Sequence, residues 1–205
     1  MNHDLDTIFF TLTGYLSGSV LYAQLFTKLF RHRDLMEVSD DRNPGTSNAF
    51  RYGGFWCGVL TLVCDLLKGF VPVHLFMEGP LHEPYSYALV MAAPVMGHAF
   101  SVFYHFRGGK GIAVTFGCLL GLLPVWQPLA TLAGYFILFS LVLKITPNYY
   151  RTLAAYVCSL ATMLFVVDWP EICIGFWFIS FAVLCRLLTS KEKKEQIEVK
   201  LLWKH

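Results

Sequence analysis

Residues 103–114, FYHFRGGKGIAV, place two cations among three glycines inside an otherwise apolar run. Glycine weakens a helix, but it lets backbone N–H groups approach an anion closely, and the start of a helix adds positive potential. The GxxxxGK[ST] spacing of a nucleotide-binding P-loop is absent. The segment predicts a phosphate site formed by Arg107, Gly108, Gly109, Lys110 and Gly111. The plainer alternative is a basic turn that contacts lipid phosphates nonspecifically.

A second polar segment, residues 40–54 with the sequence DDRNPGTSNAFRYGG, concentrates hydrogen-bond donors and two guanidinium groups. Its polar and glycine positions are Arg42, Asn43, Gly45, Thr46, Ser47, Asn48 and Arg51. Guanidinium groups match phosphate in charge and geometry. Two such segments, each joined to apolar stretches, indicate a phosphorylated substrate held at a lipid surface.

Several polar residues lie inside apolar stretches, where they are costly and often mark a site. Asp65 and Lys68 are three residues apart, so a helix places them on one face where they can pair, and the pair either neutralises itself or also orients the site. His98 stands alone on an apolar helix, which is more often a hydrogen-bonded structural position than a ligand. Gly18 and Ser19 most simply allow close packing of helices.

The composition is that of a membrane protein. The 205 residues are 56% hydrophobic and only 15% charged, and the mean hydropathy is +0.53, which soluble domains rarely reach. The six cysteines lie in apolar runs without a CxxC pair and are interpreted as small buried hydrophobes. The acidic N-terminus does not resemble a cleaved signal peptide. We expect one transmembrane domain, 1–190, and a charged tail, 191–205.

The apolar stretches predict an all-α, polytopic membrane helix bundle of about seven spans. A bilayer core of about 30 Å needs roughly 20 apolar helical residues. The predicted spans are 6–28, 54–77, 85–105, 110–124, 126–145, 151–168 and 170–188. The fourth is short and begins at the glycine cluster, which favours a partial or tilted span.

The placement of charge predicts the orientation. Fifteen of the sixteen lysines and arginines fall on one side of the predicted spans: Lys28, Arg31, Arg33, Arg42, Arg51, Arg107, Lys110, Lys144, Arg151, Arg186, Lys191, Lys193, Lys194, Lys200 and Lys204. The opposite side carries Asp4, Asp6, Glu78, Glu83, Asp168 and Glu171. The positive-inside rule then puts the N-terminus outside, and the basic loops, the candidate site and the C-terminus on the cytoplasmic side of the cell membrane. The tail is most simply a solvated helix or a frayed end.

These motifs resemble the bacterial acyl-phosphate-dependent glycerol-3-phosphate acyltransferases, small integral membrane enzymes of phospholipid synthesis, over about residues 14–190. GHAFSVFYHFRGGKG, residues 97–111, fits the family pattern G-H-x-[FY]-x-V-F-x-x-F-[KR]-G-G-K-G at every fixed position. NPGTSNAFRYGG, residues 43–54, fits the end of another family motif. The segment RTLAA offers Thr152 where the family carries a hydroxyl.

The resemblance implies transfer of an acyl group from acyl phosphate to the 1-hydroxyl of glycerol 3-phosphate, with no metal, no other cofactor and no covalent acyl-enzyme. The catalytic candidates are Arg51, Lys110, His98 and Asn48. The phosphate- and substrate-binding candidates are Asn43, Gly45, Ser47, Arg107, Gly108, Gly109, Gly111, Thr152 and Asp41. The orienting candidates are Ser19, Asp65 and Lys68. A general base would help to deprotonate the acceptor, and His98 and Asp41 are candidates by position alone.

Two departures from the family pattern concern the acceptor. Asp41 stands where the family has a serine, and its carboxylate should repel phosphate unless Arg42 neutralises it. Ser180 and Val183 replace a histidine and an asparagine of the third motif, whereas its arginine and glutamate persist at Arg186 and Glu192.

Three functions therefore stay open: a glycerol-3-phosphate acyltransferase, a paralogue that passes the acyl group to another alcohol or an amine, and a non-catalytic protein that binds phospholipid or acyl phosphate. The expected partners are these small molecules and the lipid bilayer, without nucleic acid or an obligatory protein partner. A transporter is disfavoured because the polar residues cluster at one surface.

Overall fold

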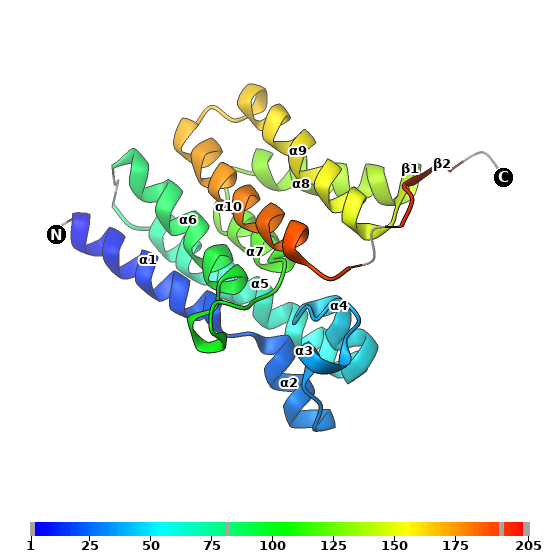
Figure 1. Cartoon of the computed structure of the whole chain (residues 1–205). Coiled ribbons are helices and arrows are strands. Elements are labelled where there is room, and N and C mark those ends of the chain that lie inside the picture. Colours follow the sequence, from blue (N-terminus) through cyan, green and yellow to red (C-terminus); the bar gives the residue numbers. More distant parts are fainter. Residues whose placement is uncertain (1–2, 81–82, 193–194, 203–205) are drawn as a thin grey trace.

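Apolar helices form most of the chain in the computed structural model, which describes residues 3–80, 83–192 and 195–202 (Figure 1). The α-helices are α1 (His3–Ser19), α2 (Tyr22–Arg31), α3 (Leu35–Val38), α4 (Thr46–Asn48), α5 (Phe55–Met77), α6 (Pro84–Ala99), α7 (Ile112–Gly121), α8 (Gln127–Ile137), α9 (Asn148–Val166) and α10 (Pro170–Thr189). Shorter elements are the π-helical turns η1 (Ala49–Gly53) and η3 (Leu138–Val142), the 3₁₀ turn η2 (Val102–Tyr104) and the strands β1 (Leu143–Thr146) and β2 (Glu198–Leu201). The predicted all-α membrane bundle is confirmed apart from the small sheet.

Within the described residues, four helical segments are long and apolar enough to cross a membrane: Phe55–Met77, Pro84–Tyr104, Asn148–Val166 and Pro170–Thr189. Shorter apolar segments are Ile112–Gly121 and Gln127–Val142. At 1.5 Å per residue, α7 is about 15 Å long, half a bilayer core. The predicted fourth span is therefore short, as its glycine-rich beginning indicated.

Helices α1 and α6 cross at very short range, and α6 also packs against α10. A Cβ added to Gly18 of α1 would collide with the Pro94 carbonyl oxygen, and one added to Gly97 of α6 would collide with the Tyr15 carbonyl oxygen. This confirms the close packing expected at Gly18. The outward face of α1 carries a stripe of exposed apolar side chains at helical spacing: Leu5, Ile8, Phe9, Leu12 and Leu16. Such a stripe is suited to lipid and not to water.

The prediction of one continuous first span, 6–28, is wrong. Helix α1 ends at Ser19, and the chain turns before α2 (Figure 1). Two carbonyl oxygens at the break accept side-chain hydrogen bonds: that of Ser19 from Ser101 Oγ at 2.6 Å, and that of Val20 from Lys68 Nζ at 2.7 Å. Partners from distant segments thus satisfy backbone groups that the helix would otherwise use.

The predicted fifth span, 126–145, and the predicted helical or frayed tail also differ from the structure. Helix α8 passes into η3 and then into β1, which pairs antiparallel with β2 of the tail. Leu143 stands opposite Leu201, and Thr146 opposite Glu198. Strand pairing joins segments more than fifty residues apart, a contact that local sequence patterns do not reveal. Lys193, Lys194 and Lys204, used in the charge analysis, lie outside the described residues.

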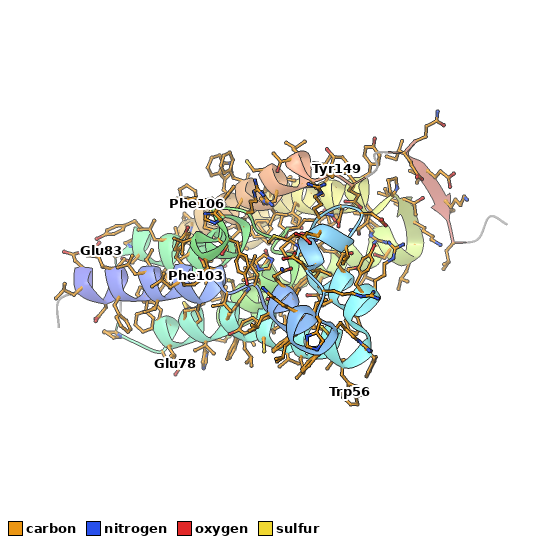
Figure 2. The ribbon with its side chains drawn as sticks, turned by 60° about the horizontal axis from the view of Figure 1, so that its bottom comes forward. Trp56, Glu78, Glu83, Phe103, Phe106 and Tyr149 are labelled. Atoms are coloured by element: carbon orange, nitrogen blue, oxygen red, sulfur yellow. The ribbon has the colours of Figure 1, made fainter. Side chains whose placement is uncertain are left out.

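The largest apolar core lies between α6, α7, α9 and α10. It contains Tyr156, whose ring stacks on Phe176 and whose hydroxyl donates to Thr115 Oγ1 at 3.0 Å. All six cysteines are free. Figure 2 shows Glu78 and Glu83 toward the end of the bundle where α1 begins, with Trp56 toward the other end. The candidate site lies at that second end.

Candidate active site

A cavity of about 1000 Å³ opens where the first polar loop meets the starts of α7 and α9 and the segment after α10. It brings together most of the predicted residues: Asp41, Asn43, Gly45, Ser47, Asn48, Arg51, Asp65, His98, Lys110 and Gly111. These come from four separate parts of the chain. The bundle therefore assembles the two polar segments identified in the sequence into one site.

Lys110 is buried on the wall of this cavity. Its Nζ lies 2.6 Å from Glu192 Oε2 and 3.4 Å from Asp41 Oδ2, and its backbone N–H donates to Asn43 Oδ1 at 3.2 Å. The ammonium group is thus held between two carboxylates, one from the first loop and one from the segment after α10. An ion pair at this burial needs such hydrogen-bonded partners on both sides.

Asp41 organises the first loop. Its Oδ1 accepts from Asn48 Nδ2 at 2.7 Å and from the Asn43 backbone N–H at 3.2 Å. Asn48 Nδ2 also donates to the Asn43 carbonyl oxygen at 2.8 Å. Arg42 was the expected neutralising partner of Asp41, but the cation beside the carboxylate is Lys110. The Asp41 carboxylate is therefore engaged by the protein's own donors.

Beneath the cavity runs a buried chain of polar side chains from the first loop to α6. Thr46 Oγ1 donates to Asp65 Oδ2 at 3.3 Å, and Asp65 Oδ1 pairs with Lys68 Nζ at 2.8 Å. Lys68 Nζ also lies 2.9 Å from His98 Nδ1. Lys68 is 5% exposed and His98 is 2% exposed. The predicted pairing of Asp65 with Lys68 on one face of α5 is confirmed.

The glycines of the RGGKG turn allow close packing against the end of α6. An added Cβ at Gly108 would collide with the His98 carbonyl oxygen, and one at Gly109 with His98 Nε2. The Gly109 N–H donates to the His98 carbonyl oxygen at 3.0 Å, and the Gly108 carbonyl oxygen accepts from Arg186 Nη2. The N–H groups of Gly109 and Lys110 therefore have protein acceptors. This differs from the expectation that the whole turn offers its N–H groups to an anion.

A smaller hollow of about 770 Å³ lies on the other side of Lys110. Asp41, Asn43, Lys110 and Lys191 line both hollows. The remaining basic residues of the smaller hollow are Arg42, Arg107 and Arg186, and its remaining acidic residues are Asp34 and Glu37. Two further predicted site residues, Arg107 and Gly108, line this second hollow and not the main cavity.

Four predicted residues line neither hollow: Ser19, Lys68, Thr152 and Gly109, the last of which packs against His98. Ser19 is buried and donates to the Tyr15 carbonyl oxygen at 2.9 Å. Lys68 reaches the cavity only through Asp65 and His98. Thr152 is fully buried on α9, and its Oγ1 has no hydrogen-bond partner among the described residues.

Several residues that line the site were not among the predicted site residues. Glu192 was noted only as a surviving motif position, although it makes the shortest contact to Lys110. Asn148 and Arg151 line the main cavity from the first turn of α9, and Arg151 donates to the Asn148 side chain. The charge of Arg151 beside a predicted span was the available signal. Across the described ranges, no group of three or more His, Cys, Asp or Glu side chains is arranged to hold a metal ion.

The sequence profile of the glycerol-3-phosphate acyltransferase family matches residues 8–199. The chain belongs to this family. It is 44% identical over 115 residues to the glycerol-3-phosphate acyltransferase of Legionella pneumophila strain Philadelphia 1, a match that covers 55% of this chain and 40% of that protein. It is 35% identical over 157 residues to the Vibrio campbellii enzyme of the same name, covering 71% of this chain and 75% of that one.

The fold agrees with this membership. The crystal structure of the integral membrane glycerol 3-phosphate acyltransferase PlsY, in its glycerol 3-phosphate form, superposes with a TM-score of 0.73 at 25% identity, covering 88% of this chain and 87% of that one. The chain is thus an integral, multi-pass membrane protein of the PlsY fold. The matched segments span about 40% of the length of the Legionella relatives.

Proposed function

We propose that the protein transfers an acyl group from acyl phosphate to glycerol 3-phosphate, releasing lysophosphatidate and inorganic phosphate. The observation that carries the proposal is the position of Lys110 on the wall shared by two hollows of different character. A transfer between two phosphorylated molecules needs two adjoining subsites, and one cation between them can serve both substrates.

The larger cavity suits the acyl donor. Leu62, Ile112 and Phe116 supply apolar surface, and Leu62 is 36% exposed on the side of α5. Asn48 and Arg51 supply donors on the polar side of the same cavity. An acyl phosphate has this same division, with a hydrocarbon chain joined to a dianionic head, so its chain would lie along the apolar wall.

The smaller hollow suits the acceptor. Its lining carries more cations than carboxylates, through Arg42, Arg107 and Arg186 together with Lys110 and Lys191. A small and fully polar dianion such as glycerol 3-phosphate fits these donors.

In the proposed reaction, the acceptor hydroxyl oxygen bonds to the acyl carbonyl carbon, and the bond from that carbon to the phosphate oxygen breaks. The hydroxyl proton leaves to solvent or to the departing phosphate. Because acyl phosphate is already activated, the protein has only to align the reactants and stabilise the developing negative charge. Lys110 and Arg51 would carry that charge stabilisation, with Asn48 as a neutral donor.

We further propose about seven membrane passes, with the N-terminus outside and both hollows facing the cytoplasm. The support is the excess of lysine and arginine in the loops at the site's end of the bundle. Glycerol 3-phosphate and acyl phosphate would then reach the site from the cytoplasm and the inner leaflet. Reaction of a single introduced cysteine with an impermeant thiol reagent, in a variant whose native cysteines are replaced, tests this orientation.

The deciding experiment uses the purified full chain in lipid, supplied with acyl phosphate and glycerol 3-phosphate. Phosphate release and acylated product are followed together. Lysophosphatidate that forms in equal amount to released phosphate supports the proposal. Donor binding without turnover, with any acceptor supplied, would contradict it and favour a non-catalytic binding protein.

A second candidate is the same transfer to a different alcohol or to an amine. Asp41 and Glu192 favour it, because both carboxylates lie at Lys110, where an incoming dianion would meet negative charge. Phosphate release that is stimulated by an amino alcohol and not by glycerol 3-phosphate would select this candidate.

A further inference from the structure

We infer that Lys68 fixes His98 as the neutral tautomer with its proton on Nε2, and that this N–H is a hydrogen-bond donor into the main cavity. His98 is then not the general base that its position suggests. The identity of the oxygen that accepts this bond, on acyl phosphate or on the forming oxyanion, rests on the proposed function. The tautomer itself does not.

The first step is the saturation of the Lys68 ammonium group. It has three N–H donors and no acceptor. Three atoms surround it: Asp65 Oδ1 at 2.8 Å, the Val20 carbonyl oxygen at 2.7 Å and His98 Nδ1 at 2.9 Å. The Val20 carbonyl oxygen accepts one of the three N–H groups, and Asp65 Oδ1, an ion-pair partner that can only accept, faces a second. The third is directed at His98 Nδ1, which must therefore accept.

The second step excludes the other protonation states of the ring. A proton on Nδ1 would face the ammonium donor at 2.9 Å and leave both groups without an acceptor. An imidazolium would add a second positive charge beside the first. Lys68, Asp65 and His98 are 5%, 1% and 2% exposed, so water cannot relieve either arrangement.

The third step is the direction of the opposite ring edge. His98 is part of the main cavity's lining. A Cβ on Gly109 would collide with Nε2, and a Cβ on Gly111 would lie 3.7 Å from Cδ2. The absent side chains of the RGGKG turn thus leave space for the Nε2 edge. Among the described residues, no protein acceptor is hydrogen bonded to Nε2, so its N–H is available to a ligand.

The relay also ties the imidazole to the first loop. Thr46 Oγ1 donates to Asp65 Oδ2 at 3.3 Å, and Thr46 lies between Asn43 and Asn48 in the sequence. Asp65 and Lys68 are positioning residues, because they act on the cavity through Thr46 and His98. A buried, fully paired relay of this kind holds a donor in place before the substrate arrives, as electrostatic stabilisation requires.

Nitrogen-15 NMR on the full chain in lipid, labelled at histidine, tests the tautomer without reference to activity. The measurement is made at about pH 8, above the ordinary imidazole pKa of about 6.5. The His98 signals are assigned by their loss in His98→Gln. The expected result is a protonated Nε2 and an unprotonated, hydrogen-bonded Nδ1. A proton on Nδ1 would overturn the inference.

The double variant Asp65→Asn/Lys68→Met tests the part assigned to Lys68, because it removes the cation and the anion together and leaves no unpaired charge. The expected spectrum shows His98 distributed between both neutral tautomers. An unchanged Nε2–H signal in a folded double variant would mean that Lys68 does not set the tautomer. If this variant does not fold, the unmodified chain still decides the main point.

Activity separates a donor from a base. His98→Gln keeps an N–H donor near the position of Nε2, whereas His98→Phe keeps only the ring shape. We expect His98→Phe to lower kcat by about 10²-fold or more, the effect of losing one such donor, and His98→Gln to retain at least about tenfold more activity than His98→Phe. Equal losses in the two variants would contradict the donor role. If the unmodified chain shows the Nε2–H tautomer but no acyl transfer, the proposed function fails and the tautomer stands.

Discussion

The two hollows that meet at Lys110 differ in the balance of charge on their walls. Carboxylates outnumber cations in the larger cavity, where they are Asp40, Asp41, Asp65, Glu192 and Glu195 against Arg51, Lys110, Arg151 and Lys191. Cations predominate in the smaller hollow, where they are Arg42, Arg107, Lys110, Arg186 and Lys191 against Asp34, Glu37 and Asp41. Only the larger one has a substantial apolar wall.

This difference suggests how one protein can bind two anionic molecules side by side without strong mutual repulsion. The donor is retained largely by burial of its hydrocarbon chain, so its subsite needs less positive charge. The acceptor has no apolar part and depends on charge and hydrogen bonds. Each of the following substitutions alters one hollow, or the lysine between them. Each tests whether kinetics change only for the substrate assigned to that hollow.

Lys110→Met should have the largest effect, because Lys110 belongs to both hollows. Losing one charged donor to a developing anion lowers kcat by about 10²- to 10³-fold. The same variant leaves Asp41 and Glu192 without their cation, so thermal unfolding is measured alongside turnover. Lys200→Ala, on the exposed strand β2, is the control with normal activity expected. Turnover close to that of the unmodified chain in Lys110→Met would refute the shared-lysine assignment.

Ala113→Phe should affect the donor alone. Ala113 is half-buried on the wall of the larger cavity and does not line the smaller one. A bulky ring there occupies space along the apolar wall, and overpacking of this kind costs about 1–3 kcal/mol. We expect the KM for a long-chain acyl phosphate to rise about tenfold, with the KM for glycerol 3-phosphate unchanged. A rise confined to glycerol 3-phosphate would reverse the assignment of the two hollows.

Much of the fold follows from the sequence because lipid imposes simple rules. Long apolar runs gave the four long helices, and the glycine cluster correctly indicated a short helix after it. The break after Ser19 was not predicted because the residues that stabilise it are distant in the sequence. Ser101 and Lys68 donate hydrogen bonds to the carbonyl oxygens of Ser19 and Val20. The pairing of β1 with β2 is hidden for the same reason. Local sequence patterns indicate local secondary structure, but they do not indicate hydrogen-bond partners from distant parts of the chain.

The sequence predicted which residues belong to the site better than it predicted the contacts between them. The two polar segments do meet, because both follow or precede spans at the same end of the bundle. The sequence did not show which polar groups of the site are already paired with other groups of the protein. Asp41 was expected to repel phosphate, yet it organises Asn43 and Asn48, and the carboxylate of Glu192 comes from beyond the last helix. Pairing depends on distances that motif spacing does not encode.

Arg51→Ala and Arg107→Ala form a matched pair across the two hollows. Both arginines are exposed, Arg51 lines only the larger cavity, and Arg107 only the smaller. The pair of Arg51 with Asp40 at 3.2 Å is exposed and weak, so a phosphate can replace the carboxylate. Each loss should weaken one phosphate contact by about 1 kcal/mol, about fivefold in KM.

The expected readout is a crossed pattern. Arg51→Ala should raise the KM for acyl phosphate, and Arg107→Ala the KM for glycerol 3-phosphate, with both effects smaller at high salt because exposed charges are screened. Equal effects of both variants on both substrates would mean that the two hollows act as a single anion site.

Asp41→Ser should have the smallest effect, because it changes two opposing contributions. Removing the carboxylate lowers the negative charge at Lys110, which favours an incoming dianion. The same change removes the acceptor that holds Asn48 Nδ2 at 2.7 Å, although Asn48 keeps its 2.8 Å bond to the Asn43 carbonyl oxygen. We expect the KM for glycerol 3-phosphate to fall by about two- to threefold, a fraction of 1 kcal/mol. Asp40→Ser, an exposed carboxylate beside it on the same loop, is the matched control and should leave that KM unchanged. A higher KM in Asp41→Ser alone would show that holding the loop in place outweighs the repulsion, and that this chain depends on the Asp41 carboxylate.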